Sequence, residues 1–305
     1  MGPAACSTSD DDEAADPPAP ALASDDDEAA PGRTTVVYTP DGAPEQQAAL
    51  AVPPLRHSTA IVLVHPGGGT GGDRTEMKAW ADFYYEHGYL TLSVDYFLFD
   101  NDTPSPVFPR PEEDVKTAVQ WLRSTADFFK ISPNRIIVHG SSAGAYLGGE
   151  LLTMPDIGPL GVAGEYEGVS DRIDGFIGFH GYYAGTVLGA PQYYGGPRTS
   201  SDPEVQARWA LADSTENAAR ATGPALLFHG DRDVVPVQLA RRFADTLTVA
   251  GKDATLIVVP GAEHGFDLAD GNLTPAGMES ADAILVWLAQ MFSDQVQTQP
   301  TPAPS

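Results

Sequence analysis

The stretch RIIVHGSSAGAYLGG, Arg135 to Gly149, joins a short apolar run to a segment of small residues through a G-x-S-x-G turn. The apolar run at 136–138 predicts a buried strand, and Ala145 to Leu152 predicts the start of a helix. A serine held in such a turn has a strained backbone that lifts its hydroxyl above the sheet, the arrangement called a nucleophile elbow. A chance match competes in a chain with 31 glycines. The strand before and the helix after favour the elbow, with Ser142 as the nucleophile.

Outside this stretch, strand-like and helix-like segments alternate. Strands are predicted at 34–38, 48–52, 59–64, 89–95, 173–180, 225–229 and 254–259, and helices at 77–87, 113–125, 237–249 and 274–292. Short continuous apolar strands separated by helices predict an α/β fold with a mostly parallel central sheet covered by helices on both faces. Reactive groups in such sheets gather at the carboxyl ends of the strands.

A glycine loop, His65-Pro66-Gly67-Gly68-Gly69, directly follows the strand predicted at 59–64. Bare backbone amides in such a loop can stabilise a negative oxygen without bulk. Because proline has no N–H, the predicted oxyanion donors are Gly67 and Gly68, together with Ala143 after the nucleophile. His65 is expected to anchor the loop by hydrogen bonds rather than to react.

The general base is predicted at His264, in the loop VPGAEHGF after the last strand. Glycines on both sides of this histidine allow the imidazole to approach a serine above the sheet. Of the other six histidines, His180 and His229 end strands and are candidates only for supporting roles. His139 is expected to pack within the elbow strand, and Glu263 is expected to be solvated.

The acid that orients the base is sought in LLFHGDRDVVP, which offers Asp231 and Asp233 just past a buried strand. In an extended turn the two side chains would point the same way. We predict Asp233 as the acid of the triad, with Asp231 as the alternative. Serine, acid and histidine then follow the chain order of the α/β-hydrolases.

Together, HPGGG, GSSAG, HGDRD and GAEHGF resemble the α/β-hydrolase superfamily over about residues 34 to 292. The elbow region is similar to carboxylesterases of the hormone-sensitive-lipase and feruloyl-esterase-like branches, and other segments resemble dienelactone-hydrolase-like proteins. That last family typically has cysteine at the elbow, whereas this chain has Ser142, which favours ordinary esters. The chain departs from the usual motifs in two further ways. Pro66 replaces the first glycine of HGGG, and HGDRDVVP has one residue fewer between Asp233 and Pro236 than the common form HGxxDxxVP.

The resemblance implies a metal-independent serine esterase without a cofactor, acting on small-molecule esters with short acyl, aryl or carbohydrate groups. A lactone hydrolase, a serine peptidase of the same fold and a non-catalytic binding protein are the alternatives. A small cap or none is expected. The segment 181–223 could form a small aromatic lid, although packing in the core is at least as good an explanation; its aromatic residues are Tyr182, Tyr183, Tyr193, Tyr194 and Trp209.

Composition bears on partners and organisation. A net charge of −25 argues against nucleic-acid partners, and no apolar run reaches the roughly 18 residues of a membrane span. The single cysteine, Cys6, excludes an intrachain disulfide and a Cys-based metal cluster.

Residues 1–33 carry the acidic heptapeptide SDDDEAA twice and are expected to be a disordered linker, as is the tail 293–305. Small residues before Cys6 resemble the start of a lipoprotein, which favours a lipid-anchored or secreted protein of the cell envelope over a cytoplasmic one.

Overall fold

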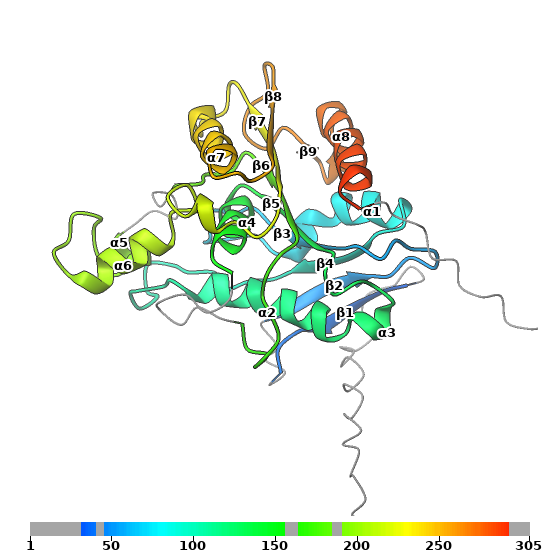
Figure 1. The fold of residues 1–305 in the computed structure, drawn as a ribbon, viewed down its shortest axis with the longest axis horizontal. Coiled ribbons are helices and arrows are strands. Elements are labelled where there is room, and N and C mark those ends of the chain that lie inside the picture. The colour runs from blue at the N-terminus through cyan, green and yellow to red at the C-terminus, as the bar shows by residue number, and fades with distance from the viewer. Residues whose placement is uncertain (1–31, 41–45, 156–163, 185–190, 293–305) are drawn as a thin grey trace, which may run out of the picture.

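The computed structural model describes residues 32–40, 46–155, 164–184 and 191–292 (Figure 1). The acidic segment before residue 32, with Cys6, and the tail from residue 293 lie outside the described residues. The described helices include none with the length and apolar character that crossing a bilayer requires.

An eight-stranded sheet forms the centre of the protein, in the order β1-β2-β4-β3-β5-β6-β7-β8. The first strand pairs antiparallel with β2, and β2 antiparallel with β4, while all pairs from β4 to β8 are parallel. The strands are β1 Arg33–Val37, β2 Gln47–Ala51, β3 Ala60–Val64, β4 Leu90–Val94, β5 Ile136–Ser141, β6 Gly175–Phe179, β7 Ala225–Gly230 and β8 Ala254–Val259. The predicted, mostly parallel α/β sheet is confirmed.

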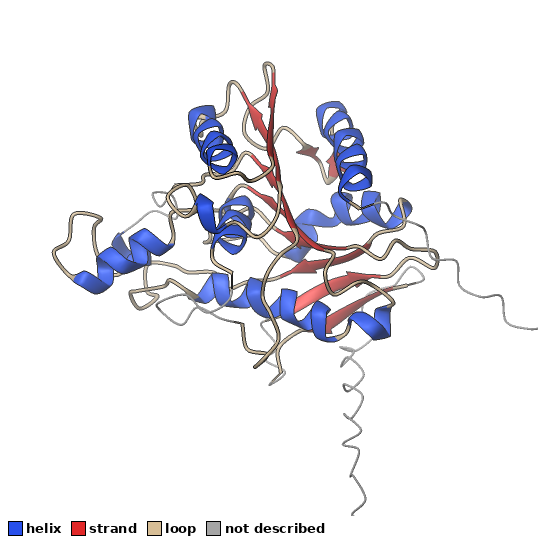
Figure 2. Ribbon diagram, viewed as in Figure 1, coloured by secondary structure: helices blue, strands red, loops and turns tan. Residues whose placement is uncertain are grey.

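Helices cover both faces of this twisted sheet (Figure 2). One face packs against α2 (Arg110–Ser124), α4 (Ala143–Thr153) and α7 (Val237–Val249). The other packs against α1 (Lys78–Glu86) and α8 (Pro275–Met291). Two hydrophobic cores therefore lie on opposite sides of the sheet.

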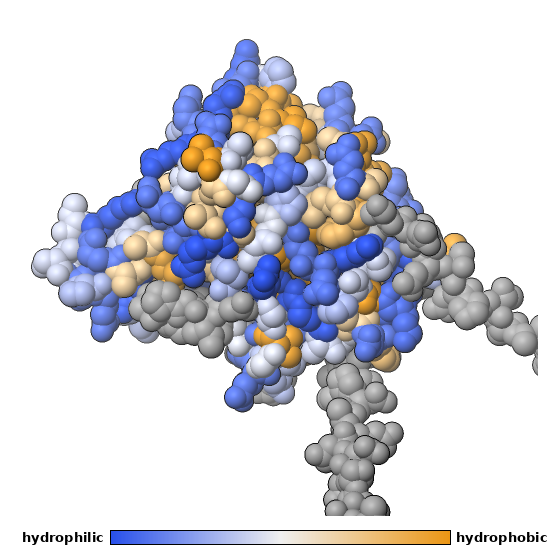
Figure 3. Space-filling model, viewed as in Figure 1, coloured by the Kyte–Doolittle hydropathy of each residue, from blue (hydrophilic) through white to orange (hydrophobic). Residues whose placement is uncertain are grey.

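The central strand β3 shows why these strands are continuously apolar. All five of its residues are buried. Ile61 and Leu63 belong to the core under α1 and α8, and Val62 and Val64 to the core under α2, α4 and α7. Since successive side chains point to opposite faces, a strand covered on both sides needs an apolar residue at every position. The outermost strand β8 is only half-buried, and apolar surface gathers at that end of the molecule in Figure 3.

The connection from β6 to β7 forms a small cap. It contains α5 (Pro191–Tyr194), α6 (Pro203–Leu211) and the short 3-10 helix η2 (Ala218–Arg220), and α5 and α6 project to one side in Figure 1. Tyr183, Tyr193, Tyr194 and Trp209 are buried in the core beside α2 and α4, and only Tyr182 is partly exposed. Core packing, rather than a mobile lid, is therefore the role of four of the five aromatic residues.

Several short elements were not predicted from the sequence. They are the 3-10 helix η1 (Arg74–Met77), the helix α3 (Ala126–Phe129), the hairpin of β9 (Leu268–Ala269) and β10 (Asn272–Leu273), and α5 and η2 of the cap. The nine-residue helix α6 was not predicted either. The helix α2 also begins three residues before its predicted start, with Pro111 in its first turn, where the missing N–H costs no intrahelical bond. Elements of two to four residues have too few positions for a periodic pattern.

Candidate active site

Ser142 occupies the sharp turn between β5 and α4. Its φ of 51° and ψ of −108° lie in a region that residues other than glycine rarely adopt. Such a conformation costs about 1–3 kcal/mol. It is held by the hydrogen bond from the Ser142 N–H to the carbonyl of Phe179 at 3.0 Å.

The two glycines of G-x-S-x-G are required by close backbone approaches. A Cβ at Gly140 would lie 2.1 Å from the carbonyl oxygen of Gly144, and a Cβ at Gly144 would lie 2.0 Å from that of Val64. Both contacts are with backbone atoms, which cannot move aside without distorting the strand or the helix. Glycine at these positions therefore lets α4 begin directly over the ends of β3 and β5.

The structure brings Ser142, His264 and Asp233 together from three distant parts of the chain. His264 Nε2 lies 2.9 Å from Ser142 Oγ, and its Nδ1 lies 2.9 and 3.0 Å from the two carboxylate oxygens of Asp233. With the Nδ1–H donating to Asp233, Nε2 is free to accept the hydrogen bond from the serine hydroxyl. This arrangement suits proton transfer from serine to histidine.

The two candidate acids have different partners. The side chain of Asp233 is fully buried and also accepts the N–H of Val235 at 2.7 Å. Asp231 instead accepts the N–H of Gly261 at 2.6 Å and so ties the turn after β7 to the loop that carries His264. The two side chains were expected to point the same way only if the turn remained extended, and the backbone instead forms a turn at residues 231–232.

His229, near the end of β7, holds the catalytic aspartate in place. Its Nε2–H donates to the carbonyl of Val235 at 2.9 Å and lies 3.5 Å from Asp233 Oδ2. Burial lowers the pKa of this imidazole, against the opposing effects of the Val235 carbonyl and the Asp233 carboxylate. His229 therefore holds the turn around Asp233.

The glycine loop lies beside the elbow because β3 and β5 are neighbouring parallel strands, with Val64 opposite Gly140. Gly67 and Gly68 have φ values of 121° and 65°. Among the residues the structure describes, no backbone acceptor pairs with the N–H of Gly67, Gly68 or Ala143. Ala143 is also the first residue of α4, where the helix dipole favours negative charge.

His65 anchors this loop. Its side chain is buried, its Nδ1–H donates to the carbonyl of Pro66 at 2.6 Å, and its ring stacks on Tyr96 at 4.2 Å. The Tyr96 hydroxyl donates to the carbonyl of His65 at 3.0 Å. Burial lowers the pKa of His65, although the Pro66 carbonyl opposes this effect. A neutral imidazole serves a structural role at this position.

Two further histidines, His139 and His180, are buried in the protein near the candidate site. His180, which follows β6, packs its ring 4.5 Å from that of His264 and bonds to Asp267 at 2.9 Å. His139, within β5, stacks against Phe179, and burial lowers its pKa to about 3. The sequence analysis did not identify Asp267 as the partner of His180. Its position three residues after His264 would have placed it close to the candidate site.

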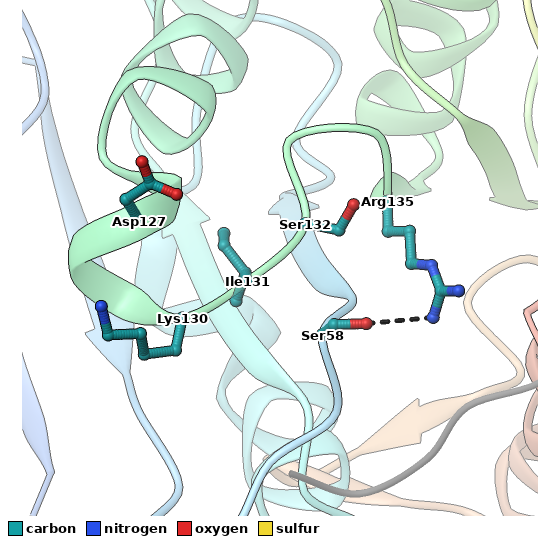
Figure 4. A pocket seen from close by; sticks show the side chains of 6 residues that line it. All are labelled: Ser58, Asp127, Lys130, Ile131, Ser132 and Arg135. Carbon is teal, nitrogen blue, oxygen red and sulfur yellow. Dashed lines mark hydrogen bonds between the residues drawn. The ribbon is translucent and has the colours of Figure 1, made fainter.

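A surface cavity of about 380 Å³ lies elsewhere, at the amino-terminal ends of β3 and β5 (Figure 4). It is lined by Ser58, Asp127, Lys130, Ile131, Ser132 and Arg135. Ser142 lies at the carboxyl end of β5, on the opposite edge of the sheet, so we do not assign this cavity to the candidate site. In the described part of the chain, no group of three or more His, Cys, Asp or Glu side chains is arranged to hold a metal ion.

Two family models and several curated proteins match this chain. A family model described as BD-FAE matches residues 51–154, and the model of the prolyl oligopeptidase family matches residues 110–295. Esterase LipC of Mycobacterium tuberculosis is 31% identical over 258 residues, which cover 80% of this chain and 61% of LipC. Acetylxylan esterase of Xylanibacter ruminicola is 28% identical over 217 residues, which cover 68% of this chain and 41% of that enzyme.

Similar folds also occur among solved structures. Esterase Est2 of Thermogutta terrifontis superposes with a TM-score of 0.71 over 86% of this chain and 93% of its own, at 21% identity. The fold similarity to Est2 therefore extends over nearly the whole length of that esterase. The chain spans about three fifths of the length of LipC. From its fold and from the family match over more than half of its length, the chain belongs to the prolyl oligopeptidase family within the α/β-hydrolase superfamily.

Proposed function

We propose that this protein is a serine esterase that hydrolyses carboxylic esters through an acyl-enzyme intermediate. The observation that carries the proposal is the continuous relay of hydrogen bonds from Ser142 Oγ through His264 to the buried carboxylate of Asp233. A serine hydroxyl is a weak nucleophile unless an adjacent base removes its proton, and this relay supplies such a base with an orienting acid. Similarity to LipC and to acetylxylan esterase supports ester bonds as the target.

The reaction has two halves. In the first, Ser142 Oγ attacks the ester carbonyl while His264 Nε2 takes its proton, and the proton then passes to the departing alcohol. In the second, His264 removes a proton from water, whose oxygen attacks the acyl carbon. The bond from that carbon to Ser142 Oγ then breaks, His264 returns the proton to Oγ, and the acid leaves. Asp233 stabilises the imidazolium that forms in each half.

The tetrahedral intermediates carry a negative oxygen. Backbone N–H groups of Gly67, Gly68 and Ala143 are the proposed donors to this oxygen, because they have no backbone acceptor among the described residues. Gly67 and Gly68 belong to the loop beside the elbow, and Ala143 follows Ser142 directly as the first residue of α4. Fixed amide dipoles at such a position cost no reorganisation during the reaction. Loss of one such donor typically costs about 10²–10³-fold in kcat.

The proposed substrates are esters of short acyl groups, including acetyl groups on carbohydrates. Four of the five aromatic residues of the β6–β7 connection are buried in the core, which leaves little of the cap to enclose a long chain. We expect the hydrolysis of p-nitrophenyl esters to be fastest with acetyl to butyryl groups. A rate that rises steadily toward long-chain esters would contradict this assignment.

The decisive experiment is hydrolysis of p-nitrophenyl acetate by wild type, Ser142→Ala and Ser141→Ala. Ser141 is the matched control, because it neighbours Ser142 in the same turn and its Oγ lies 3.4 Å from His180 rather than within the relay. We expect Ser142→Ala to lose about 10³-fold or more in kcat and Ser141→Ala to lose less than about tenfold. Equal rates in wild type and Ser142→Ala would refute the esterase.

Fluorophosphonate labelling tests the alternative of a non-catalytic binding protein. An activated serine reacts covalently with this probe, so wild type should be labelled and Ser142→Ala should not. A folded wild-type protein that remains unlabelled while Ser142 lies 2.9 Å from His264 would favour binding without catalysis.

Peptide hydrolysis is the second candidate function, because the matching family model takes its name from prolyl oligopeptidases. The same nucleophile would serve an amide substrate, so the two functions differ only in substrate. A panel of acetyl, feruloyl and aryl esters, a lactone and prolyl-peptide substrates separates them. We expect the esters to be preferred and both activities to require Ser142.

A further inference from the structure

The loop that carries His264 runs from the end of β8 to the start of β9 and contains Gly261 and Gly265, both with a φ of 72°. At its beginning, the N–H of Arg232 donates to the carbonyl of Ala262 at 3.0 Å, and Asp231 accepts the N–H of Gly261. These bonds tie the first half of the loop to the turn after β7. The second half, which follows His264, needs its own anchor if the imidazole is to hold one position.

Asp267 supplies a buried anchor three residues after His264. It is only 1% exposed, and its two carboxylate oxygens accept hydrogen bonds of 2.9 Å, one from His180 Nε2 and one from Trp80 Nε1. Its backbone carbonyl accepts the N–H of Thr274 at 2.9 Å. Burial acts to raise the pKa of this carboxyl, but the hydrogen bonds and charge of its partners hold the pKa below its ordinary value. The carboxylate is therefore fixed from two sides, by α1 and by the end of β6.

His180 holds this carboxylate from a strained position. Its φ is 39°, its side chain is buried, and its N–H donates to the carbonyl of Phe228 at 2.8 Å. Within the described residues, the buried Nδ1 has no hydrogen-bond partner. The proton on Nε2 is the one donated to Asp267, because a carboxylate oxygen can only accept a hydrogen bond. The ring then meets that of His264 edge to face, with 4.5 Å between their centroids.

We infer that His180 and Asp267 form a second histidine–aspartate pair that positions His264. The inference rests on the proposed function, since it concerns the base of that reaction. Neither residue acts on the substrate; both are positioning residues. The pair works through one hydrogen bond: Asp267, held by His180, ties down the loop just after His264.

The consequence for catalysis is specific. Breaking the His180–Asp267 bond frees the second half of the loop while the Asp233 bond and the substrate-binding surface remain. The distance from His264 Nε2 to Ser142 Oγ then varies, and a displacement of about 1 Å at a reacting group can cost up to about 10²-fold in rate. Because ground-state binding is untouched, the loss should fall on kcat and not on KM.

Two substitutions at His180 separate the bond from the ring. His180→Gln keeps a side-chain N–H near the position of Nε2 and loses the ring, whereas His180→Phe keeps a ring and loses the N–H. Asp267→Asn weakens the pair from the other side, because its single amide oxygen cannot accept from both His180 and Trp80 as the two carboxylate oxygens do. His139→Gln is the matched control, because His139 is an equally buried histidine of the neighbouring strand that contacts Trp80 and Phe179 rather than His264.

The measurement is kcat and KM with p-nitrophenyl acetate for these variants and wild type, with rates divided by the fraction of protein labelled by a fluorophosphonate at completion. The rate of Ser142→Ala, which has no serine to label at this position, is given per mole of folded protein. We expect kcat to fall about tenfold or more in His180→Phe and Asp267→Asn, with KM within about twofold of wild type. His180→Gln should keep kcat within about threefold, and His139→Gln should keep the wild-type kcat per labelled site.

Wild-type kcat in His180→Phe and Asp267→Asn would overturn the inference, and so would a loss in His180→Gln as large as that in His180→Phe. If His180→Phe does not fold, Asp267→Asn against His180→Gln makes the same comparison. Loss of activity in Ser142→Ala together with full activity in His180→Phe refutes the positioning pair alone. Equal rates in Ser142→Ala and wild type refute the esterase itself, and the positioning pair with it.

Discussion

Asp233, and not Asp231, meets the imidazole of His264: both of its carboxylate oxygens lie within 3.0 Å of Nδ1, while Asp231 bonds to the backbone of Gly261. The two aspartates are two residues apart and share one turn, so they provide a matched pair for mutation. We predict that Asp233→Asn lowers kcat by about 10³–10⁴-fold, because the asparagine favours the wrong tautomer of His264. Asp231→Asn should cost less than about tenfold, since the amide oxygen can still accept the Gly261 N–H. Steady-state kinetics of the two variants make the test, and a larger loss at Asp231 would reverse the assignment.

The backbone strain at Ser142 predicts an unusual order of stability. Glycine accepts a φ of 51° at little cost, whereas alanine keeps the strain, and both lack the hydroxyl. We therefore expect Ser142→Gly to be more stable than Ser142→Ala by about 1–2 kcal/mol in urea unfolding.

Ser141 supplies the control for this comparison, because it ends β5 and has no positive φ. There, alanine should be more stable than glycine by roughly 0.5–1 kcal/mol, the ordinary order. The same order at both positions would mean that the elbow is not strained in solution.

Gly144 should tolerate no side chain. A Cβ there would lie 2.0 Å from the carbonyl oxygen of Val64, so Gly144→Ala must push α4 away from β3. We expect a loss of about 3 kcal/mol or more in the free energy of unfolding, together with loss of esterase activity.

Gly149→Ala, in the same helix, is the comparison. Its nearest neighbour would be a Tyr183 ring carbon at 3.1 Å, a side-chain atom that can shift slightly. The higher helix propensity of alanine offsets part of this crowding, so the change should stay within about 1 kcal/mol. Urea unfolding of both variants measures the two free energies of unfolding. If Gly144→Ala lost no more stability than Gly149→Ala, the crowding against Val64 would not be the cause of the loss.

The raised pKa of Asp114 predicts that its contribution to the free energy of unfolding falls as the pH rises. Burial raises the pKa of this carboxyl to about 7, although the Phe97 N–H and the Gln46 amide donate hydrogen bonds to it. A folded pKa above the unfolded value of about 4 means that the folded protein binds the proton more tightly. The contribution to stability is therefore fully present below about pH 4 and is lost as the pH rises toward 7.

Asp114→Asn removes this titration. Relative to wild type, the variant should gain on the order of 2–3 kcal/mol in the free energy of unfolding between pH 5 and pH 8, measured by urea titration at both values. Because every other group titrates alike in the two proteins, the difference isolates Asp114. A difference between variant and wild type that does not change with pH would contradict the raised pKa.

Much of the fold followed from local pattern. The apolar runs of β3 and β5 and the helical stripe of α2 were predicted within a few residues, because residues buried on both faces of a sheet, or on one face of a helix, leave a periodic signal. The elbow was equally visible, since the strained turn and the close approach of α4 to β3 demand glycines at fixed positions around one serine.

By itself, then, the sequence determined the order of strands and helices, the turn that presents Ser142 and the loops that carry His264 and the two aspartates. It did so because strand and helix propensities, burial patterns and turn chemistry act over a few neighbouring residues. Only the tertiary structure decided between Asp233 and Asp231, buried the cap tyrosines in the core, and paired His180 with Asp267 across 87 residues. Those outcomes depend on the path of the backbone after each strand and on contacts between distant segments, which leave no periodic mark in the chain.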